Sequence, residues 1–384
     1  MSVSDGHGGG ITLQRVLGSD LNRIGMFCHV SRFARDVPPR PELLDRSLFV
    51  VSPLQEDFSR RWLRSSGARL YALPWVKSQH AERAASRMLA KLPAREHITA
   101  IVCPQGTESL LAVEALKRQR RVSYISWMMD DHIVRYDRGR WRYPGAIRDL
   151  METHLREAST VFAISPSLAQ FYREEFGIAS EILFSPAERL HETATAISPA
   201  GPLTIGYFGR VFAWQFGALR AFAEALSSER ERLDIYSPEP PPAQLQQPAV
   251  RYRGAVSKDR VPGLMKEYDA VLIPIGFEEE VRNLSAFNIA TKMSECIASG
   301  TLTLVYGPAD SAMVRYLDPT GASVILADQR LAQWPETAAA LKNPDFRRRT
   351  LAAAEHLFET ELSVEVMRSR WRCALQELHL RLTE

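Results

Sequence analysis

Residues 98–128 read ITAIVCPQGTESLLAVEALKRQRRVSYISWM, which is an apolar run, an amphipathic stretch and a second apolar run. The two apolar runs, Ile98–Cys103 and Ser123–Met128, have the length and composition of buried strands. Gly106 and Thr107 open the segment between them, which has helical spacing. Its apolar residues fall on one side of the predicted helix: Leu110, Leu111, Val113 and Leu116. A strand, a helix and a strand in this order predict a parallel βαβ unit.

The same alternation extends in both directions. Before residue 186, strands are also predicted at Ile24–Val30, Ser47–Val51, Thr160–Ser165 and Glu181–Phe184, and helices at Gly145–Ala158 and Pro166–Phe176. Residues 186–202 lack periodicity and carry Ser, Thr, Pro and Gly, which is typical of a linker. After it, strands are predicted at Leu203–Phe208, Leu233–Tyr236, Val250–Tyr252, Ala270–Pro274 and Leu302–Val305, and helices over about 214–227, 258–267 and 286–298. From about residue 328 the pattern is mostly helical.

This organisation predicts an α/β protein with two Rossmann-like α/β/α domains. We expect an N-terminal domain over 1–185, a linker over 186–202, a second domain over 203–360, and a C-terminal helix over 361–384 that packs back toward the first domain. Ligands bind such sheets at the carboxyl ends of the strands. Binding residues are therefore expected in the loops after Phe208, Pro274 and Val305.

Composition narrows the class of protein. The chain has 384 residues, of which 45% are hydrophobic and 24% are charged, and this fits two globular domains. No run approaches the roughly 18 apolar residues of a membrane-spanning helix, and the first 23 residues contain no apolar secretory segment. The four cysteines lie far apart without metal-binding spacing, which is typical of a reducing compartment. We therefore expect a cytoplasmic protein.

The net charge of +3 is unevenly distributed. Residues 1–185 carry 26 Lys and Arg against 20 Asp and Glu, a net charge of +6, whereas the remainder carries 22 against 25, a net charge of −3. A positive half favours an anionic partner or peripheral contact with an anionic membrane, and a solvated arginine-rich surface is the alternative. The basic residues gather at Lys117, Arg118, Arg120 and Arg121 and in the loop 135–142. We identify no compact basic motif of the kind that binds nucleic acid, so we expect no nucleic-acid binding.

The segment Ile205–Arg210, IGYFGR, places a glycine and a fixed cation at the carboxyl end of a predicted strand. Gly209 would let a ligand approach the backbone, and the planar guanidinium of Arg210 suits a phosphate. A turn glycine followed by a surface arginine is the alternative interpretation.

A second segment, Asn288–Gly300, reads NIATKMSECIASG. Lys292 and Glu295 are three residues apart, so both would project from one side of a helix near its start. A carboxylate there can accept hydrogen bonds from both hydroxyls of a ribose, while an ammonium group and helix N–H groups suit phosphate. A surface Lys–Glu pair is the alternative.

Together these segments resemble the nucleotide-sugar-binding domain of group-1 (family-four-like) glycosyltransferases of the GT-B fold. The resemblance is carried by GYFGR at 206–210, VRYRGAVSKDRVPGLMKEYDAVLIP at 250–274 and NIATKMSECIASG at 288–300. Earlier, VFAISPSLAQFYREEFG at 161–177 resembles the end of the acceptor domain of these enzymes. The resemblance implies two Rossmann-like domains facing a cleft. It also implies a nucleotide-sugar donor in the C-terminal domain, an acceptor in the N-terminal domain, and no metal or other cofactor.

The resemblance also implies roles for individual residues. Arg210, beside Gly209, and Lys292 would contact the donor diphosphate, and Glu295 would contact the ribose. The backbone of Gly254, Ala255 and Val256 would lie near the base. Asn288 matches an Asn-x-x-Lys-x-x-Glu form of the motif with one extra residue.

Two positions depart from the family pattern. Phe287 stands eight residues before Glu295, where the paired-glutamate motif has a carboxylate, and Gln215 stands where a lysine is frequent. These departures concern the positions expected to contact the donor sugar and to bear on the stereochemistry. The loop after Pro274 holds Glu278, Glu279 and Glu280, which would either supply a carboxylate or form a solvated acidic turn.

In the N-terminal half, Asp130, Asp131 and His132 directly follow a predicted strand. Such a set can hold a metal or act in acid–base catalysis. In similar glycosyltransferases an Asp-Asp segment faces the acceptor, so we expect Asp130 or Asp131 to position the acceptor or take its proton. A helix N-cap with a surface acid is the alternative. Arginines around Trp141, namely Arg135, Arg138, Arg140 and Arg142, suit an anionic acceptor or a lipid phosphate, or form a solvated loop.

The N-terminal stretch Ser4–Ile11, SDGHGGGI, resembles the glycine-rich turn that follows the first strand of this fold. Gly8, Gly9 and Gly10 would then let the backbone approach the donor. Only Met1–Ser4 precede this stretch. Either the chain starts late, or these residues form a flexible tail.

We therefore expect a retaining hexosyltransferase that moves a sugar from a nucleoside-diphosphate sugar to a glycan or lipid-linked acceptor in cell-surface polysaccharide synthesis. Arg210 and Lys292 would stabilise the leaving diphosphate, and Asp130 or Asp131 would be the base for an inverting reaction. His132, Arg140 and Trp141 would face the acceptor. The alternatives are a non-catalytic binding subunit of the same fold and a nucleotide-sugar 2-epimerase.

Overall fold

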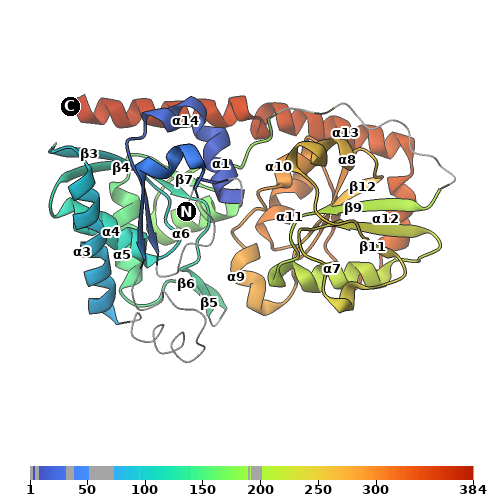
Figure 1. Ribbon diagram of the computed structural model, residues 1–384. Helices are drawn as coiled ribbons and strands as arrows, with labels where there is room; N and C mark the ends of the chain where they lie inside the picture. Colours follow the sequence, from blue (N-terminus) through green and yellow to red (C-terminus); the bar gives the residue numbers. More distant parts are fainter. Residues whose placement is uncertain are drawn as a thin grey trace. The chain divides into compact units, whose positions relative to one another are not determined.

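The computed structural model describes residues 3–4, 8–31, 39–51, 73–94, 96–137, 139–188, 191 and 201–383. The chain divides into two compact units (Figure 1). The N-terminal unit comprises Met1–Ile164, Leu168–Ser185 and Arg368–Glu384, and the C-terminal unit comprises Ser165–Ser167 and Pro186–Met367. In both units the strands of the larger sheets are parallel and alternate with helices, as the sequence predicts.

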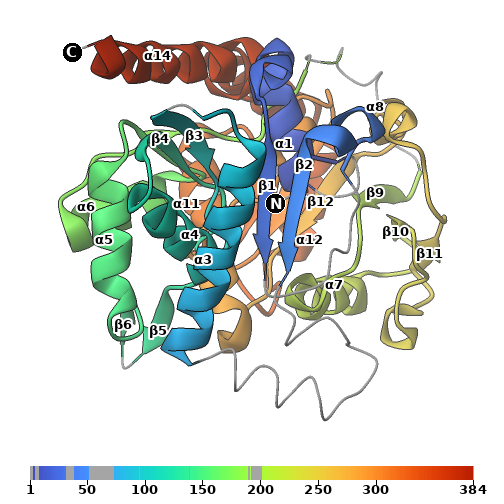
Figure 2. The ribbon, with the colours of Figure 1, turned by 60° about the vertical axis from the view of Figure 1, so that its left-hand side comes forward.

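The N-terminal unit holds two parallel sheets. One pairs β1 (Phe27–Ser31) with β2 (Ser47–Val51), and the other has the order β3 (His97–Val102), β4 (Arg121–Met128), β7 (Val161–Ala163), β8 (Glu181–Ile182). Figure 2 shows β1 and β2 as a ribbon of their own, apart from β3 and β4. A short antiparallel hairpin, β5 (Arg135–Asp137) and β6 (Arg140–Arg142), follows β4. The helices are α1 (Gly8–Leu17), α3 (Pro74–Lys91), α4 (Thr107–Lys117), α5 (Ile147–Glu157), α6 (Pro166–Phe176) and, from Arg368 onward, α14 (Val364–Thr383).

Apolar residues of both sheets pack on α3 and α4. The cluster joins Leu48 and Val50 of β2 to alanines of both helices, whose small side chains allow close approach. The end of the chain also belongs to this unit. The Nε of Arg368 donates to the Arg15 carbonyl at 2.8 Å, and the indole N–H of Trp371 donates to the Asp20 carboxylate at 3.3 Å.

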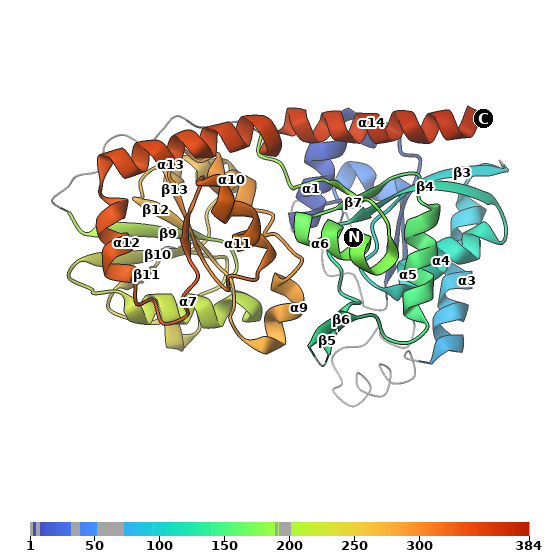
Figure 3. The same cartoon turned by 180° about the vertical axis from the view of Figure 1, so that it is seen from behind.

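The C-terminal unit has one six-stranded parallel sheet (Figure 3). Its order is β11 (Val250–Tyr252), β10 (Glu231–Tyr236), β9 (Leu203–Phe208), β12 (Ala270–Pro274), β13 (Leu302–Tyr306), β14 (Val324–Leu326). The chain builds outward from β9 to β11 on one side and then from β12 to β14 on the other. The carboxyl ends of β9 and β12 therefore form a topological switch point, where ligands bind in sheets of this kind.

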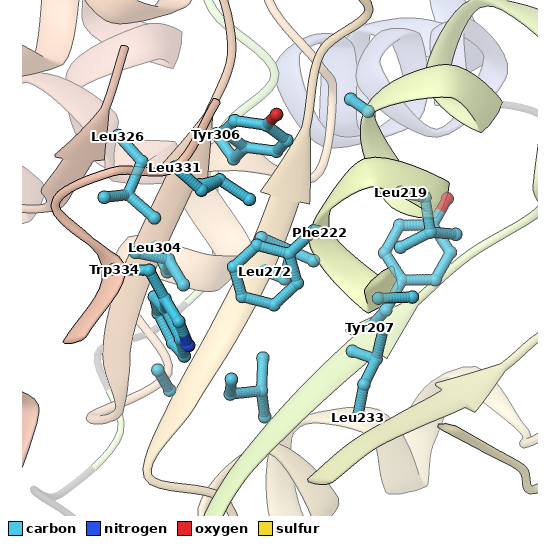
Figure 4. Packing of buried hydrophobic residues seen from close by; sticks show 14 of the residues in the cluster. Tyr207, Leu219, Phe222, Leu233, Leu272, Leu304, Tyr306, Leu326, Leu331 and Trp334 are labelled. Carbon is cyan, nitrogen blue, oxygen red and sulfur yellow. The ribbon is translucent and has the colours of Figure 1, made fainter. Parts of the chain in front are cut away.

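Helices surround this sheet: α7 (Ala213–Ala225), α8 (Val261–Met265), α9 (Arg282–Ser285), α10 (Met293–Ile297), α11 (Ala312–Leu317), α12 (Trp334–Leu341) and α13 (Pro344–Leu357). Figure 4 shows the packed core, in which Phe222 of α7 and Trp334 of α12 meet edge to face, with ring centroids 5.0 Å apart. The strand side chains beneath them include Leu272 and Leu304, both almost fully buried. This core fixes the positions of the strand ends.

The continuous helix predicted over 286–298 is wrong. The chain instead forms α9 at Arg282–Ser285, a non-helical stretch, and the five-residue helix α10 at Met293–Ile297. The hydroxyl of Ser165 donates to the Phe287 carbonyl. Tertiary contacts therefore occupy a backbone group that a continuous helix would have used.

The turn predicted at Gly8–Gly10 is also wrong, because these residues form the first turn of α1. Glycine is a poor helix former in a helix interior. At the start of a helix the backbone N–H groups have no intrahelical partner, so glycine destabilises a helix less there than in its interior. Residues 5–7 of the same stretch lie outside the described residues.

Candidate functional site

The first part of the candidate site is the carboxyl end of β9. Gly209 follows Phe208, and its φ of 144° is one that L side chains rarely adopt. Its backbone N–H donates to the Tyr236 carbonyl at the end of β10, at 2.9 Å. Arg210 comes next, with a half-exposed side chain whose Nε lies 3.7 Å from a carboxylate oxygen of Glu239. The strand end thus presents a glycine and an accessible guanidinium.

The second part is Lys292, which the fold brings to the same strand end. Its Nζ donates to the Phe208 carbonyl at 3.3 Å and lies 4.1 Å from the centre of the Tyr207 ring. A Cβ placed on Gly209 would be 3.5 Å from this Nζ. Burial lowers the pKa of Lys292 to about 8, and the nearby Cys296 and Glu295 oppose that change. Two segments 84 residues apart in sequence therefore meet at the switch point.

Lys292 and Glu295 do not share one face near the start of a long helix. Lys292 is the residue that precedes α10, and Glu295, which is half-buried, lies in the first turn of that short helix. Asn288 lies in the non-helical stretch before them. Its side-chain oxygen is buried and accepts no hydrogen bond from the described part of the chain. Since buried acceptors are rarely left unpaired, this oxygen is suited to a donor on a ligand.

The segment expected near the base follows β11. Gly254 has a φ of 80°, and its carbonyl accepts a hydrogen bond from the Ser237 backbone N–H at 3.1 Å. The Tyr252 hydroxyl donates to the Ser237 carbonyl at 3.0 Å. These bonds fix the loops after β10 and β11 against each other. Ala255 is exposed and Val256 is half-buried, so the segment is accessible.

Both positions that depart from the family pattern are buried. Gln215 accepts a hydrogen bond from the Tyr207 hydroxyl at 2.9 Å, and that hydroxyl lies 2.6 Å from the Arg210 carbonyl. Phe287 is an apolar residue at 5% exposure. Gln215 therefore holds the turn after β9 in place, and Phe287 fills a packed position rather than supplying a carboxylate.

Two glycines that the sequence does not single out, Gly217 and Gly276, lie against the carboxylate of Glu278. A Cβ on Gly217 of α7 would lie 1.5 Å from one carboxylate oxygen of Glu278, and a Cβ on Gly276 would lie 2.6 Å from the other. The Gly276 N–H also donates to the Trp214 carbonyl at 3.1 Å, which joins the loop after β12 to the start of α7. Only the three-dimensional contact identifies these glycines. It places the Glu278 carboxylate against α7, whereas Glu279 and Glu280 begin a short 3₁₀ turn.

In the N-terminal unit the two adjacent aspartates differ in environment. Asp131 is buried and accepts hydrogen bonds from the Ile133 and Val134 N–H groups at 3.0 and 3.1 Å. It also accepts hydrogen bonds from the hydroxyls of Tyr143 and Tyr172, at 2.5 and 3.0 Å. Four donors thus hold this carboxylate, which organises the loop after β4.

Asp130 is the more accessible carboxylate. One third of its side chain is exposed, and an oxygen lies 3.9 Å from His132 Nε2. Burial raises the pKa of Asp130 to about 6; His132 opposes this rise and Asp131 adds to it. A carboxyl group with a pKa near 6 can exchange a proton close to neutral pH.

The basic residues of this unit are partly neutralised. Lys117 pairs with Glu114 at 2.7 Å and also with Glu157, and Arg118 pairs with Glu82. In the β5–β6 hairpin the rings of Trp141 and Tyr136 lie 5.2 Å apart, and Arg140 is exposed beside them. Arg138 lies outside the described residues.

Among the described residues, no group of three or more His, Cys, Asp or Glu side chains is placed to hold a metal ion. None of the helices described is long and apolar enough to cross a membrane.

Comparison with known proteins identifies the fold. No protein-family model and no curated protein matches the sequence. Among solved structures, sucrose-phosphate synthase from Thermosynechococcus elongatus is similar with a TM-score of 0.66 and 13% identity, covering 98% of this chain and 95% of that chain. Anabaena Alr3699/HepE, solved in complex with UDP and glucose, gives a TM-score of 0.59 and 13% identity over 97% of both chains.

A third similar structure is the apo form of the lipopolysaccharide outer core galactosyltransferase WaaB. It gives a TM-score of 0.60 and 12% identity, covering 98% of this chain and 96% of that chain. Likeness at such low identity establishes architecture. The chain therefore has the GT-B fold of glycosyltransferases, as its sequence motifs imply.

Proposed function

We propose that this protein is a glycosyltransferase that takes a sugar from a nucleoside-diphosphate sugar and gives it to a glycan or lipid-linked acceptor. The donor would bind the C-terminal unit at the carboxyl ends of β9 and β12. The similar structures support this proposal, since one of them was solved with UDP and glucose.

The observation that carries the proposal is the position of the Lys292 ammonium group beside Gly209 at the end of β9. A partly desolvated cation at a switch point attracts an anionic ligand strongly, because its charge is poorly screened there. The glycine leaves room beside it. A diphosphate would supply the negative charge that balances the ammonium group.

Residues near Lys292 and at the ends of the neighbouring strands would supply the remaining contacts to the donor. The half-exposed guanidinium of Arg210 is free to leave Glu239, 3.7 Å away, for a phosphate. Glu295 and the unpaired oxygen of Asn288 would accept hydrogen bonds from ribose or sugar hydroxyls. The loop at Gly254 would contact the base through backbone groups. Because the two cations already offset the diphosphate charge, we propose that transfer needs no divalent metal.

In the reaction, Lys292 and Arg210 would stabilise the charge that develops on the leaving diphosphate. A retaining reaction needs no strong base. For proton transfer from the acceptor, Asp130 is better suited than Asp131, whose carboxylate already accepts four hydrogen bonds. His132, 3.9 Å from Asp130, and the β5–β6 hairpin with Arg140 and Trp141 would face the acceptor.

We also propose a role in cell-surface polysaccharide synthesis at the cytoplasmic face of a membrane. The charge of +6 on residues 1–185 supports contact with anionic lipid. The ion pairs of Lys117 and Arg118 reduce that contribution. Vesicles rich in anionic lipid should sediment the protein at low salt and release it at high salt; protein that stays in the supernatant at low salt would refute membrane contact.

One observation favours a second candidate, a binding subunit of the same fold without activity. Phe287 is packed in the interior where related motifs carry a carboxylate, and Gln215 is engaged with Tyr207. The two candidates share donor binding and differ only in turnover.

A panel of nucleotide sugars tests the proposal. Thermal shifts with UDP, GDP and ADP select the nucleotide, since a ligand raises stability according to its occupancy. The corresponding nucleotide sugars are then assayed for hydrolysis and transfer, with and without chelator. Binding with turnover supports the transferase, and binding without turnover supports the binding subunit. Loss of turnover in chelator, restored by Mg²⁺ or Mn²⁺, would refute the metal-free mechanism.

A further inference from the structure

Tyr207 of β9 contacts both of the residues that are proposed to bind the donor diphosphate. It directly precedes Phe208 and is fully buried, and Figure 4 shows its ring on the side of the sheet that α7 covers. The ring contacts Lys292, and the hydroxyl contacts the backbone of Arg210. One buried side chain therefore joins two cations that lie far apart in the sequence.

The ring of Tyr207 lies beneath the ammonium group of Lys292. The Nζ is 4.1 Å from the centre of the ring and donates to the Phe208 carbonyl at 3.3 Å. The negatively polarised face of an aromatic ring attracts a cation, and more strongly where both are withdrawn from water. Glu295 and Cys296 of α10 are the titratable groups that raise the pKa of Lys292, whereas burial lowers it. The ring adds to their effect, so it favours the charged amine and holds it at the strand end.

The hydroxyl of Tyr207 fixes the turn that carries Arg210. It lies 2.6 Å from the Arg210 carbonyl oxygen and 2.9 Å from the side-chain oxygen of Gln215, and its one proton is shared between these acceptors. Gln215 is buried in the first turn of α7, so the hydroxyl joins the turn after β9 to the start of that helix. A Cβ on Gly209 would lie 3.7 Å from the same hydroxyl oxygen, which places this bond beside the glycine.

The side chain of Arg210 is itself held weakly. It is half-exposed, and its Nε lies 3.7 Å from a carboxylate oxygen of Glu239, which is longer than a hydrogen bond. The position of the guanidinium therefore depends on the backbone from which it extends. A fixed backbone limits the conformations that the side chain must give up when it binds an anion.

We propose that Tyr207 is a positioning residue for the transfer reaction, acting on Lys292 through its ring and on Arg210 through its hydroxyl. Gln215 contributes by holding the hydroxyl from α7. The two actions are separable, because loss of the hydroxyl should impair Arg210 and a weaker ring face should affect Lys292. This inference rests on the proposed function, since it requires both cations to bind the donor diphosphate.

A double-mutant cycle tests the action of the hydroxyl. The values of kcat and KM for the nucleotide sugar are measured in wild type, Tyr207→Phe, Arg210→Ala and the double variant. Tyr207→Phe should lower kcat/KM by about five- to tenfold, mostly in kcat, because Arg210 acts on the leaving diphosphate. In the Arg210→Ala background the same change should alter kcat/KM by less than about twofold, since the group through which the hydroxyl acts is gone.

Tyr306→Phe is the matched control. Tyr306 is another fully buried tyrosine of the same sheet, and its hydroxyl also donates to a backbone carbonyl, that of Gln329, at 2.8 Å. Tyr306→Phe should lower the melting temperature about as much as Tyr207→Phe and leave kcat/KM unchanged. An equal loss of activity in Tyr306→Phe would show a general effect of buried hydroxyls and overturn the proposal.

Fluorination tests the action of the ring. Residue 207 is replaced by 3,5-difluorophenylalanine and compared with Tyr207→Phe, because the two rings have nearly the same shape but fluorine withdraws electron density from the ring face. Calorimetry then measures the affinity for the nucleoside diphosphate across pH. The pH above which affinity falls should be lower by about half a pH unit or more with the fluorinated ring. Tyr207→Phe should keep the wild-type value, since its ring face still attracts the ammonium group.

The results distinguish this inference from the proposed function. A wild type that neither binds a nucleoside diphosphate nor turns over a nucleotide sugar would refute the proposed function and this inference together. If wild type binds without turnover, the same cycle is measured as affinity for the nucleoside diphosphate. Where wild type binds, either of two results overturns this inference alone: additive effects of Tyr207→Phe and Arg210→Ala, or an unchanged pH profile with the fluorinated ring.

Discussion

Replacing Lys292 with methionine should stabilise the protein while removing its affinity for the donor. Burial lowers the pKa of Lys292 from 10.5 to about 8. One pKa unit corresponds to about 1.4 kcal/mol, so protonated Lys292 costs the folded state roughly 3 kcal/mol at pH 7. Methionine keeps the apolar stem and loses the hydrogen bond to the Phe208 carbonyl, which contributes about 1 kcal/mol. The net expectation at pH 7 is a gain of about 2 kcal/mol in the free energy of unfolding.

The sign of this effect depends on pH. The unfolded chain keeps the proton on Lys292 up to about pH 10.5, whereas the folded chain releases it near pH 8. Wild-type stability therefore rises from pH 8 to pH 10.5, because the unfolded state binds more protons in that interval. The advantage of Lys292→Met should shrink over the same range and be gone at its upper end.

Urea denaturation of wild type and Lys292→Met at pH 7 and pH 10.5 measures both effects. Lys266→Met is the control, because Lys266 is another half-buried lysine of the same unit. Calorimetry with the nucleoside diphosphate selected by thermal shift completes the test. A variant less stable than wild type at pH 7, or equally stabilised at both pH values, would refute the burial argument. Undiminished nucleotide affinity in Lys292→Met would refute the role of Lys292 in donor binding.

Three further outcomes are expected. The affinity for nucleoside diphosphate should fall above pH 8, by up to about tenfold per pH unit, because binding then requires a proton on Lys292; a flat profile between pH 7 and pH 9.5 would argue against this. Arg210→Ala should cost on the order of 2–4 kcal/mol of transition-state stabilisation in kcat/KM, whereas Arg220→Ala, an equally exposed arginine paired with Glu224, should change it little. Activity of Arg210→Ala within twofold of wild type would refute the contact between Arg210 and the donor diphosphate. Glu295→Gln should weaken nucleotide sugar and free nucleoside diphosphate together without lowering the melting temperature; unchanged affinity by calorimetry would return Glu295 to a surface role.

Apolar periodicity was sufficient to predict most of the fold. The strands Ser47–Val51, Val250–Tyr252 and Ala270–Pro274 have the predicted bounds, as does the helix Pro166–Phe176. In these segments local pattern and tertiary burial agree. Over 286–298 they disagree. The spacing of Ile289, Met293 and Ile297 suggests a helix, but the chain is non-helical until Met293.

The candidate site was predictable in its residue types and not in its geometry. The sequence shows a strand end with Gly209 and a distant Lys292, but not their contact, which depends on strand order. It also cannot distinguish Asp130 from Asp131, because adjacent carboxylates differ only in the partners that the fold supplies. The contact between Glu278 and Gly217 has no local signature, since it joins a loop to a helix of a different βα segment.

The central claim is that a donor diphosphate binds at the carboxyl end of β9. A crystal structure with the nucleoside diphosphate that gives the largest thermal shift tests it most directly. We predict diphosphate oxygens within hydrogen-bond distance, about 3 Å, of the Lys292 ammonium group, and the Arg210 guanidinium turned away from Glu239 toward them. A diphosphate bound elsewhere, with Lys292 still donating only to the Phe208 carbonyl, would contradict the account.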